Sequence, residues 1–510
     1  MQLREIASLV NGQLYAGHDV EIERITLDSR NVRPGSLFAA VVDPMRNGEH
    51  YIEHALDAGA EAVLAAREVE TYGRPILVVD DVREALAKTA HMLTGHPTHD
   101  MLLVGITGTN GKTSLAYLLE AILTAAGHSV GVIGTVTHRF AGKVIPAANT
   151  TPEAPDLADL LWAMKDAEVS AVVMEVSSHA LALSRVTGCE FNAAIFTNLT
   201  RDHIDFHLDM DRYATAKARL FSEHLTDDPN LAVVNWDDEY CNEVLRAAGG
   251  KFVQTYGMSE GTDFHIVDAV ADRKGVRLRL TTPEGDLEFA STLLGPFQAY
   301  NIAAAAATAL NLGVAPDTIV QAVRNFRAVP GRMEPVPDPD VTVLVDYAHT
   351  PDALVNVVGA ARALTEGRLF TVFGCGGDRD RGKRPMMAKA AATESDICVV
   401  TSDNPRTEKA DEIIEDVLNG LNLVGMDRLD ASTLAAYRGN NGFVVEPDRR
   451  KAIAMAIAAA QAGDLVLIAG KGHEDYQIIG REKIHLDDRE EAAAALAARR
   501  VMGGRSGADL

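Results

Sequence analysis

A glycine-rich loop between an apolar strand and a helix is the feature that most constrains how this chain can fold. The apolar run 101–106 leads into the loop 107–114, with the sequence TGTNGKTS, and a helical pattern follows. A strand, such a loop and a helix N-terminus together aim backbone N–H groups at an anion, so the sequence predicts an α/β unit that binds phosphate. The common spacing GxxxxGK[ST] is not met, because Ile106 stands where its first glycine is required. A plain glycine-rich turn with an exposed lysine is the alternative interpretation.

Polar residues in and near this loop carry the expected chemistry. Lys112 is placed to reach the β- and γ-phosphates of a nucleotide, and Thr113 to offer its hydroxyl to Mg²⁺. Glu175 closes the apolar run 171–176, and a carboxylate at the end of a neighbouring strand suits the same metal. His203 follows a further strand and is a candidate ligand of a second metal shell, although its polar segment is as compatible with a satisfied hydrogen-bond network. The whole loop is expected to hold the nucleotide through Gly108, Thr109, Asn110, Gly111, Lys112, Thr113 and Ser114.

Apolar runs alternate with helical patterns along the whole chain, which is typical of α/β proteins. A chain of 510 residues exceeds the size of one hydrophobic core, so several domains are expected. Turn-forming residues interrupt the alternation at 95–98 and at 329–332. We therefore expect three domains, at 1–98, 99–331 and 332–510. The central one is a P-loop ATPase domain with a parallel sheet buried on both faces, and the last is a Rossmann-like, doubly wound domain.

Composition excludes several classes of partner. A formal net charge of −24 disfavours nucleic acid and anionic membrane surfaces, because both attract a positive face. The four cysteines form no CxxC pair, which suits reduced thiols in a cytoplasm. No signal-peptide pattern and no stretch of 18 uncharged apolar residues occurs. The sequence thus predicts a cytoplasmic protein with small-molecule substrates, no membrane insertion and an oligomeric state that the pattern leaves open.

Ordered motifs along nearly the whole chain resemble the Mur ligase family, most closely its diaminopimelate-adding members. The motifs are LDSR (27–30), GTNGKTS (108–114), NTTPE (149–153), EVSSHAL (175–181), NLTRDHIDFH (198–207), YATAKARLF (213–221), PGRME (330–334), DYAHTPDAL (346–354), FGCGGDRDRGKRP (373–385), SDNPRTE (402–408) and AGKGHEDYQ (469–477). The resemblance implies an N-terminal domain for a UDP-sugar, a central ATPase domain and a C-terminal domain that closes over the site. It also implies ATP-dependent ligation of meso-diaminopimelate to the D-glutamyl γ-carboxylate of UDP-N-acetylmuramoyl-L-alanyl-D-glutamate, through an acyl phosphate, in peptidoglycan precursor synthesis.

The resemblance assigns roles to residues that the pattern alone does not. Lys217 looks like a solvated helix lysine on bare sequence, yet its family counterpart is carbamylated and helps to bind a second Mg²⁺. It joins Lys112, Glu175 and His203 as a catalytic residue, and the implied metal ligands are Thr113, Glu175, His203 and Lys217. The further ATP contacts implied are Asn301, Arg332 and Asp346. The implied UDP-sugar-peptide contacts are Leu27, Ser29, Asn149, Thr150, Thr151, Ser177 and Arg185. Leu183 replaces a glutamine that relatives often carry two positions before that arginine.

Selection of diaminopimelate over lysine is the finest prediction. The distal end of diaminopimelate carries a carboxylate that lysine lacks, and arginine binds a carboxylate with two parallel hydrogen bonds. Arg406 closes the DNPR sequence, which matches the diaminopimelate motif of the family. The implied diaminopimelate contacts are Arg379, Asp403, Asn404, Pro405, Arg406, Gly470 and Glu474.

Three alternatives remain at this point. The first is a relative that adds lysine or that resembles folylpolyglutamate synthetase. Arg406 argues against the lysine-adding enzyme, and the N-terminal domain argues against the folylpolyglutamate type. The second is a P-loop ATPase that forms no bond. The third is a non-catalytic scaffold, for which the phosphate loop, Glu175 and Lys217 would be unnecessary.

Overall fold

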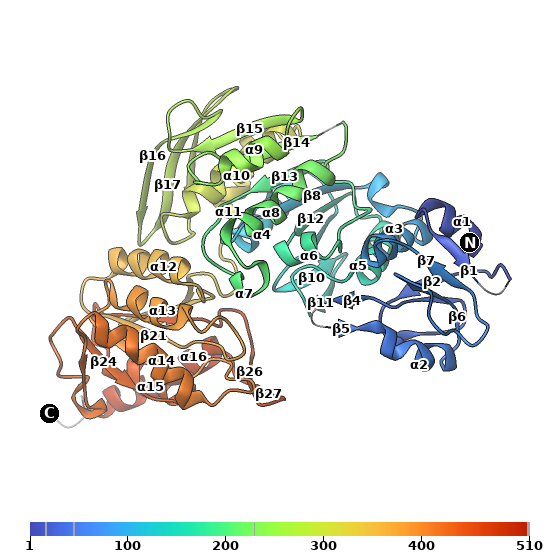
Figure 1. Cartoon of the computed structure of the whole chain (residues 1–510). Helices are drawn as coiled ribbons and strands as arrows, with labels where there is room; N and C mark the ends of the chain where they lie inside the picture. The colour runs from blue at the N-terminus through green and yellow to red at the C-terminus, as the bar shows by residue number, and fades with distance from the viewer. Residues whose placement is uncertain (16–17, 44–45, 229, 507–510) are drawn as a thin grey trace.

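Three lobes follow one another along the chain, and the N-terminal and C-terminal lobes flank a larger central one (Figure 1). The computed structural model describes residues 1–15, 18–43, 46–228 and 230–506, with side chains up to residue 500. Each lobe is built around its own β-sheet, of five, eleven and seven strands. The expected α/β class with three domains is confirmed, while the boundaries at residues 98 and 331 stay a prediction.

The N-terminal lobe is a small sheet in which β1 pairs antiparallel with β7 and the other neighbours pair in parallel. Its strand order is β1 (Gln13–Tyr15), β7 (Ile76–Val78), β6 (Ala60–Ala65), β3 (Ser36–Ala39) and β2 (Arg24–Thr26). Around it lie α1 (Leu3–Leu9), η1 (Ser29–Asn31), β4 (Val42–Asp43), β5 (Arg46–Asn47), η2 (Gly48–Tyr51), α2 (Ile52–Asp57) and α3 (Val82–Leu93). Helix α3 begins where Asp81 accepts hydrogen bonds from the N–H groups of Arg83 and Glu84, and it packs on the central lobe.

The central lobe follows η3 (Pro97–Asp100) and contains the phosphate loop. Its strand order is β11 (Lys143–Pro146), β10 (Thr137–Phe140), β9 (Val130–Ile133), β12 (Ala171–Glu175), β8 (Leu102–Thr107), β13 (Ala193–Phe196), β14 (Leu231–Asn235), β15 (Phe252–Gly257), β16 (Phe264–Asp272), β17 (Gly275–Thr282) and β18 (Gly285–Ser291). Its helices are α4 (Lys112–Ala125), α5 (Ala154–Asp166), α6 (Ser178–Ala182), α7 (Ile204–His207), α8 (Met210–Glu223), α9 (Cys241–Ala247), α10 (Gln298–Asn311) and α11 (Pro316–Asn325).

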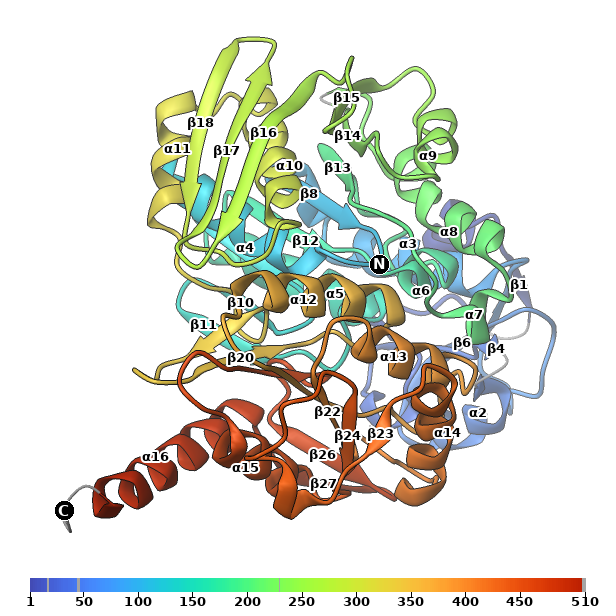
Figure 2. The same cartoon turned by 90° about the vertical axis from the view of Figure 1, so that its left-hand side faces the viewer.

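This sheet is not wholly parallel, which corrects the expectation from the apolar runs. The neighbours in the run β9-β12-β8-β13-β14-β15-β16 pair in parallel. At one edge β10 and β11 are added in antiparallel fashion, and at the other edge β17 and β18 pair antiparallel beyond β16. In β17 buried and exposed residues alternate, as expected where one face of an antiparallel strand meets water. That period-two signal in VRLRL was present in the sequence and was missed because only continuous apolar runs were considered. Figure 2 shows β16, β17 and β18 between α11 and α10 and above α12.

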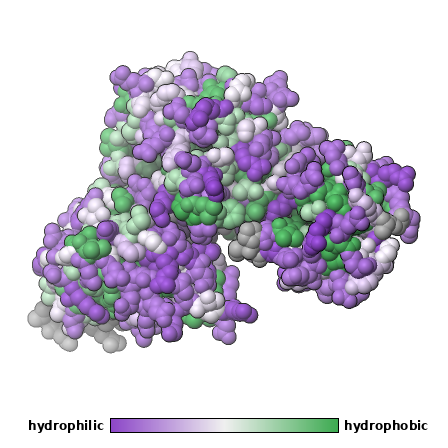
Figure 3. Space-filling view, in the orientation of Figure 1, coloured by the Kyte–Doolittle hydropathy of each residue, from purple (hydrophilic) through white to green (hydrophobic). Residues whose placement is uncertain are grey.

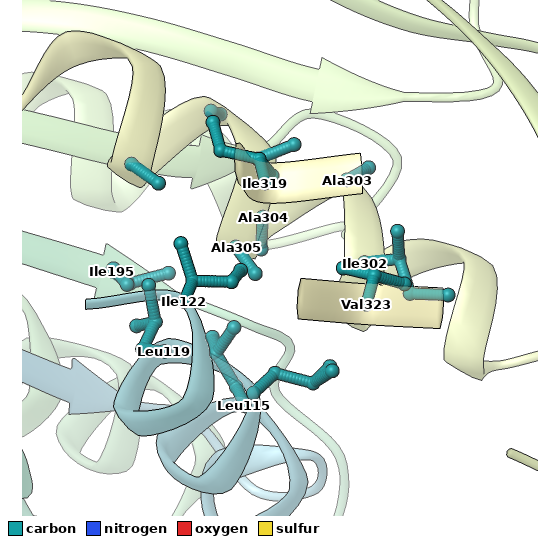
Figure 4. Close-up of a cluster of buried hydrophobic side chains, with 14 of the residues drawn as sticks. Leu115, Leu119, Ile122, Ile195, Ile302, Ala303, Ala304, Ala305, Ile319 and Val323 are labelled. Atoms are coloured by element: carbon teal, nitrogen blue, oxygen red, sulfur yellow. The ribbon is translucent and has the colours of Figure 1, made fainter. Parts of the chain in front are cut away.

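A hydrophobic cluster holds α4, and with it the phosphate loop, against the sheet. Leu115, Leu119 and Ile122 on one face of α4 meet Ile195 of β13 and the side chains of α10 and α11 (Figure 4). All four of these side chains are fully buried. Burial of such a side chain is worth about 1.5 to 3 kcal/mol, so the cluster fixes the direction in which the first turn of α4 points.

The C-terminal lobe is a second, mostly parallel α/β unit. Its strand order is β19 (Glu334–Val336), β20 (Thr342–Asp346), β25 (Leu465–Ala469), β21 (Leu369–Phe373), β22 (Ile397–Val400), β24 (Gly442–Val445) and β23 (Asp427–Arg428). The remaining elements are α12 (Pro351–Leu364), α13 (Lys383–Ala392), α14 (Ala410–Leu423), η4 (Ala431–Thr433), α15 (Arg449–Ala459), the hairpin β26 (Tyr476–Ile479) and β27 (Glu482–His485), and α16 (Asp488–Ser506). The face seen in Figure 3 is largely hydrophilic, with hydrophobic residues in small groups. None of the helices described is both long and apolar enough to cross a membrane.

Candidate active site

A cavity of about 470 Å³ lies at the carboxyl ends of β8, β12, β13 and β14. This is the edge at which open parallel α/β sheets place their ligands. Residues after β20 and the first turns of α12 line the cavity from the C-terminal lobe, so two lobes enclose it. The expected site residues that line it are Thr109, Asn110, Gly111, Lys112, Thr113, Ser114, Thr150, Glu175, Ser177, His203, Lys217, Asn301, Arg332 and Asp346.

The phosphate loop connects strand β8 to helix α4, as the sequence predicts. Gly108 and Gly111 have φ values of 147° and 88°, in the region that favours glycine. A Cβ on Gly108 would lie 1.9 Å from Oγ1 of Thr197. The N–H groups of Thr109 and Asn110 donate to Asn198, at 2.8 and 2.9 Å, which anchors the loop to the segment after β13. Helix α4 starts immediately after the loop, so its unpaired N–H groups and positive dipole end face the cavity.

Two lysines converge on one carbonyl oxygen of this loop. Nζ of Lys112 donates to the carbonyls of Gly108 and Thr109, at 2.8 and 2.9 Å, and Nζ of Lys217 donates to Gly108 at 2.7 Å. Among the residues that the structure describes, neither amine has a carboxylate oxygen within 4.0 Å. Burial lowers the pKa of both, and for Lys217 the charge of Lys112 adds to the effect. The side chain of Lys217 is therefore not the solvated helix lysine of the bare-sequence interpretation: only 1% of it is exposed.

Glu175 stands beside Thr113 as a metal site requires. One of its carboxylate oxygens accepts from the hydroxyls of Thr113 and Thr135, at 3.0 and 2.9 Å, and the other accepts from the N–H of Thr135 at 2.9 Å. Oxygen donors of this kind fit Mg²⁺, which takes one or two carboxylates and completes its shell with water and phosphate oxygens. The described residues contain no cluster of three or more His, Cys, Asp and Glu side chains that would cage a metal alone. The donor set thus fits a magnesium ion shared with a nucleotide.

His203 lies at the entrance of α7 and has a positive φ of 55°. Its N–H donates to Asp202 at 2.9 Å, and its Nε2 lies 3.3 Å from the same carboxylate. Burial lowers the pKa of His203 to about 3, so the imidazole is neutral and keeps a lone pair. Nζ of Lys383, in the C-terminal lobe, lies 3.7 Å from Oδ1 of Asp202, the oxygen that accepts from the N–H of His203. The histidine therefore sits where the two lobes meet.

Asn301, Arg332 and Asp346 are held at the cavity in different ways. Arg332 donates to the hydroxyl of Thr113 at 3.0 Å, so a residue from beyond the central lobe reaches the phosphate loop. The amide of Asn301 donates to Gln298 at 2.8 Å. The carboxylate of Asp346 accepts from the N–H groups of Met333 and Ala348, both at 2.7 Å. Burial raises the pKa of Asp346. Its two hydrogen bonds to backbone N–H groups show that this carboxylate also stabilises the local structure.

A second cavity, of about 850 Å³, joins the first. Both are lined by Thr135, Thr150, Ser177, His203 and Tyr347. The residues expected at the sugar-peptide or at diaminopimelate that line the second cavity are Asn149, Thr150, Thr151, Ser177, Arg185, Arg379 and Glu474. Residues expected at the sugar-peptide and at the diaminopimelate thus share one space next to the phosphate loop.

Leu27 and Ser29 line neither cavity. Leu27 packs in the hydrophobic core of the N-terminal lobe, and Ser29 starts the short helix η1 and is 7% exposed. Leu183 ends α6, and its carbonyl oxygen lies 3.5 Å from Arg83 of the N-terminal lobe. Arg83 also pairs with Glu153, at 3.3 Å. Because Glu153 also pairs at 2.8 Å with Arg185, which lines the second cavity, a link between the N-terminal lobe and that cavity runs through Arg83, which the sequence did not single out.

The DNPR segment is organised by a lysine that the sequence analysis passed over. Lys471 is fully buried, and its Nζ lies 3.2 Å from Asp403, 3.4 Å from Glu474 and 3.0 Å from the amide oxygen of Asn404. Asn404 in turn donates to Glu474 at 3.0 Å. Burial opposes ionisation of Asp403, but Lys471 and Arg449 prevail and lower its pKa. Burial and the charge of Asp403 raise the pKa of Glu474.

Arg406 and Gly470 lie at the edges of this network. Arg406 has a φ of 52° and donates to the carbonyl of Gly377 at 2.8 Å. Neither Arg406 nor Pro405 lines the two cavities, so the structure does not bring Arg406 next to the sugar-peptide residues. Gly470 has a φ of 118°, and a Cβ there would lie 3.8 Å from Asp403. Of the expected diaminopimelate residues, Arg379 and Glu474 are thus the ones that reach the shared space.

Comparison with known proteins decides the family. Residues 106–309 match the Mur ligase middle domain, and residues 331–472 match the Mur ligase, glutamate ligase domain. A relative from Geobacter metallireducens is 46% identical over 504 residues, which cover 97% of this chain and 98% of the relative, and is named UDP-N-acetylmuramoyl-L-alanyl-D-glutamate--2,6-diaminopimelate ligase. The chain belongs to the Mur ligase family. A relative from Geobacillus thermodenitrificans with the same name is 41% identical over 98% of this chain and all of its own length.

Solved structures agree with this Mur ligase assignment. A structure titled UDP-N-acetylmuramoyl-L-alanyl-D-glutamate--2,6-diaminopimelate ligase superposes with a TM-score of 0.66 at 33% identity, covering 94% of this chain and 95% of its own. A folylpolyglutamate synthase from Mycobacterium tuberculosis complexed with ADP reaches a TM-score of 0.61 at 21% identity over 82% of this chain. The second likeness concerns the fold alone. The fold is thus common to a wider group, whereas the match in sequence is to relatives named as diaminopimelate ligases.

Proposed function

We propose that this Mur ligase joins meso-diaminopimelate to the D-glutamyl γ-carboxylate of UDP-N-acetylmuramoyl-L-alanyl-D-glutamate, with conversion of ATP to ADP and phosphate, in peptidoglycan precursor synthesis. One observation carries the proposal: the cavity at the phosphate loop opens into the cavity lined by Thr150, Arg185, Arg379 and Glu474. A nucleotide and two further substrates can therefore meet at one junction. The name shared by relatives at 41% to 46% identity supports the choice of substrates.

The chemistry follows from the charge of the acceptor carboxylate. An ionised carboxylate resists attack by an amine, so ATP phosphorylates it first, and the acyl phosphate then gives the amide and releases phosphate. Lys112 and the N-terminus of α4 are positioned to stabilise charge on the transferred phosphoryl group, which is mainly a matter of placement and electrostatics. Thr113 and Glu175 would hold Mg²⁺, which screens the phosphate oxygens from the incoming carboxylate. Arg332, which already reaches Thr113, adds a second cation from outside the phosphate loop.

We further propose the division of labour along the chain. Residues 1–98 bind the UDP-sugar, with Leu27 and Ser29 at its uridine part, 99–331 bind ATP, and 332–510 bind diaminopimelate. Because the joined cavities are lined from both the central and the C-terminal lobe, closure about Pro330 and Gly331 would assemble the site. The nucleotide and the UDP-linked substrate are cytoplasmic metabolites, so we place the enzyme in the cytoplasm.

Lys217 is proposed to work as a carbamate. The neutral amine adds to CO₂, forms an N–C bond and releases one proton. The product is an anionic, carboxylate-like group that would bind the metal together with His203. The lowered pKa of the buried Lys217 favours the neutral amine that this step needs. We expect Lys217→Ala to be inactive, and short carboxylates in solution to restore part of its activity. Full activity of Lys217→Arg would contradict the proposal, because arginine supplies no metal-binding oxygen.

The function is tested by a mass-spectrometric assay with ATP, the UDP-muramoyl dipeptide, and either diaminopimelate or lysine. We expect a product one diaminopimelate residue heavier, made in step with ADP and phosphate, and little product with lysine. A lysine adduct formed as readily would point to the lysine-adding class. ADP release without any amide product would favour an ATPase that forms no bond.

A further inference from the structure

The ring of Tyr347 contacts residues from both substrate sites. Tyr347 follows β20, and the guanidinium carbon of Arg332 lies 4.4 Å from the centre of its ring. The imidazole of His473 lies 5.0 Å from the same centre, tilted by 37°, and His349 meets the ring edge-on at 4.6 Å. Its hydroxyl donates no hydrogen bond to any residue that the structure describes. Tyr347 therefore contacts these neighbours through its ring and not through its hydroxyl.

Each of two neighbours of this ring leads to a different site. Arg332 donates to the hydroxyl of Thr113 in the phosphate loop, at 3.0 Å. His473 immediately precedes Glu474, whose carboxylate accepts from Asn404 at 3.0 Å in the DNPR network. Tyr347 thus connects the residue that reaches the nucleotide site to the loop that carries a diaminopimelate contact.

Two glycines allow the backbone before Arg332 to approach the backbone before His473 closely. Gly331 and Gly472 have φ values of 66° and 53°, in the region that favours glycine. A Cβ on Gly331 would lie 2.1 Å from the nitrogen of His473, and a Cβ on Gly472 would lie 2.6 Å from the oxygen of Gly331 and 2.7 Å from Cβ of Tyr347. No side chain fits at either position. This close approach is what sets Arg332 and His473 against one ring.

Simple core packing would explain a buried tyrosine equally well, but Tyr347 is not simply in the core. Of the five residues that line both cavities, four belong to the central lobe, and Tyr347 is the one from the C-terminal lobe. It is half-buried and faces the junction at which the proposed substrates meet.

We propose that Tyr347 is a positioning residue that couples the diaminopimelate site to the nucleotide site by holding Arg332 and the His473–Glu474 loop against one ring. This inference rests on the proposed function. Binding of diaminopimelate orders the loop at Glu474, the loop steadies the ring, and the ring holds Arg332 over Thr113. Because such coupling is reciprocal, diaminopimelate tightens the nucleotide by the same factor as the nucleotide tightens diaminopimelate.

The test compares three variants of the full chain with wild type. Tyr347→Phe keeps the ring, Tyr347→Leu removes it, and Tyr437→Leu is a matched control that removes a ring of the same lobe away from both cavities. Affinity for a non-hydrolysable ATP analogue is measured by calorimetry with and without diaminopimelate, in the presence of the UDP-muramoyl dipeptide. Turnover and Michaelis constants are measured in parallel, and circular-dichroism melting reports folding.

In wild type we expect diaminopimelate to tighten the ATP analogue. Tyr347→Phe should keep this coupling, whereas Tyr347→Leu should lose it and lower kcat about 2- to 30-fold, the range that a lost cation–π contact corresponds to. The Michaelis constant for the dipeptide substrate should stay within about twofold, and Tyr437→Leu should resemble wild type.

Three results would overturn the inference: no coupling in wild type, unchanged coupling in Tyr347→Leu, or equal loss in Tyr347→Phe. Should Tyr347→Leu fail to fold, His473→Gln tests the same link from the amino-acid side, where retained coupling would equally contradict it. A wild-type enzyme that makes no amide at all would refute the proposed function instead, so the two failures are distinguishable.

Discussion

The lysines at the phosphate loop and the lysine behind the DNPR segment differ in their partners. Within the described part of the chain, Lys112 and Lys217 donate only to carbonyl oxygens of the loop, whereas Lys471 lies within 3.4 Å of two carboxylates and an amide oxygen. Lys217 and Lys471 are buried, whereas Lys112 is half-buried and lines the cavity. A buried cation without a carboxylate is costly to keep, whereas a paired one is compensated.

The difference indicates what each lysine is for. Lys112 and Lys217 have no internal anion among the described residues, so they are free to meet an external one or to change their chemical form. Lys471 is already neutralised by Asp403 and Glu474 and acts as a structural centre. We therefore expect Lys112 and Lys217 to take part in binding and catalysis. Lys471 is expected to fix the geometry of the diaminopimelate site.

The largest expected effect is on stability, from Lys471→Met. Removal of the cation leaves Asp403 buried without its main partner, which costs about 3 to 5 kcal/mol in the free energy of unfolding. Denaturant titration against wild type measures it, with Lys389→Met on the exposed face of α13 as a control that should change little. If Lys471→Met unfolds at the same denaturant concentration as wild type, Lys471 does not stabilise the fold, and it does not differ from Lys112 and Lys217 in this respect.

Lys112→Ala should give the opposite pattern. We expect kcat to fall by about a hundredfold to a thousandfold, because one preorganised charge next to the transferred phosphoryl group is lost. Stability should be unchanged or slightly higher, since burial already lowers the pKa of Lys112 and no carboxylate loses a partner. A phosphate-release assay and a melting curve measure the two effects. Near-normal ATP consumption would refute the assignment of Lys112.

Arg406→Ala should lower specificity for diaminopimelate by about tenfold to a hundredfold, because a hydrogen bond to a charged group is worth about 1.5 to 3 kcal/mol. Arg406→Lys should restore only part of it, since a point charge does not reproduce the two-pronged geometry. The measurement is the ratio of kcat/KM for diaminopimelate and lysine, with Arg481→Ala at the exposed turn of the β26–β27 hairpin as the control. Arg406 lies outside both cavities, so an unchanged ratio would move the role to Arg379, which lines the second.

The smallest expected effect is the pH dependence of diaminopimelate binding through Glu474. Burial and Asp403 raise the pKa of Glu474 above its usual 4.5, so the folded protein holds this proton to a higher pH than the unfolded chain. The Michaelis constant for diaminopimelate should therefore rise on acidification at a higher pH than for an ordinary glutamate. For the same reason the free energy of unfolding falls as the pH rises from the unfolded to the folded pKa of Glu474. Glu474→Gln should remove this fall and flatten the binding profile. A profile identical to wild type in Glu474→Gln would exclude this carboxylate.

Much of the architecture could be predicted because local patterns decide it. The strands at 101–106, 171–176 and 231–235 were recognisable as continuous apolar runs, and the structure places β8, β12 and β14 within a residue of them. The antiparallel strands β16 to β18 were missed, since alternating residues on a half-exposed strand give a weaker signal. Glu175 was recognisable as a strand-end carboxylate beside a phosphate loop. Arg83, Tyr347 and Lys471 were not singled out, because only contacts between distant segments give them their importance.

By itself the sequence determined the α/β class, the phosphate loop and the family resemblance, because these depend on residues close together in the chain and on ordered motifs. Only the tertiary structure decided that Lys112 and Lys217 meet on the carbonyl of Gly108, while Lys471 meets the carboxylate of Asp403 from a distant segment. The physical reason is that burial and charge pairing are set by neighbours far away in the chain. For that reason a lysine at the phosphate loop is available to bind an anion, whereas Lys471, in the C-terminal lobe, is paired with carboxylates and stabilises the structure around it.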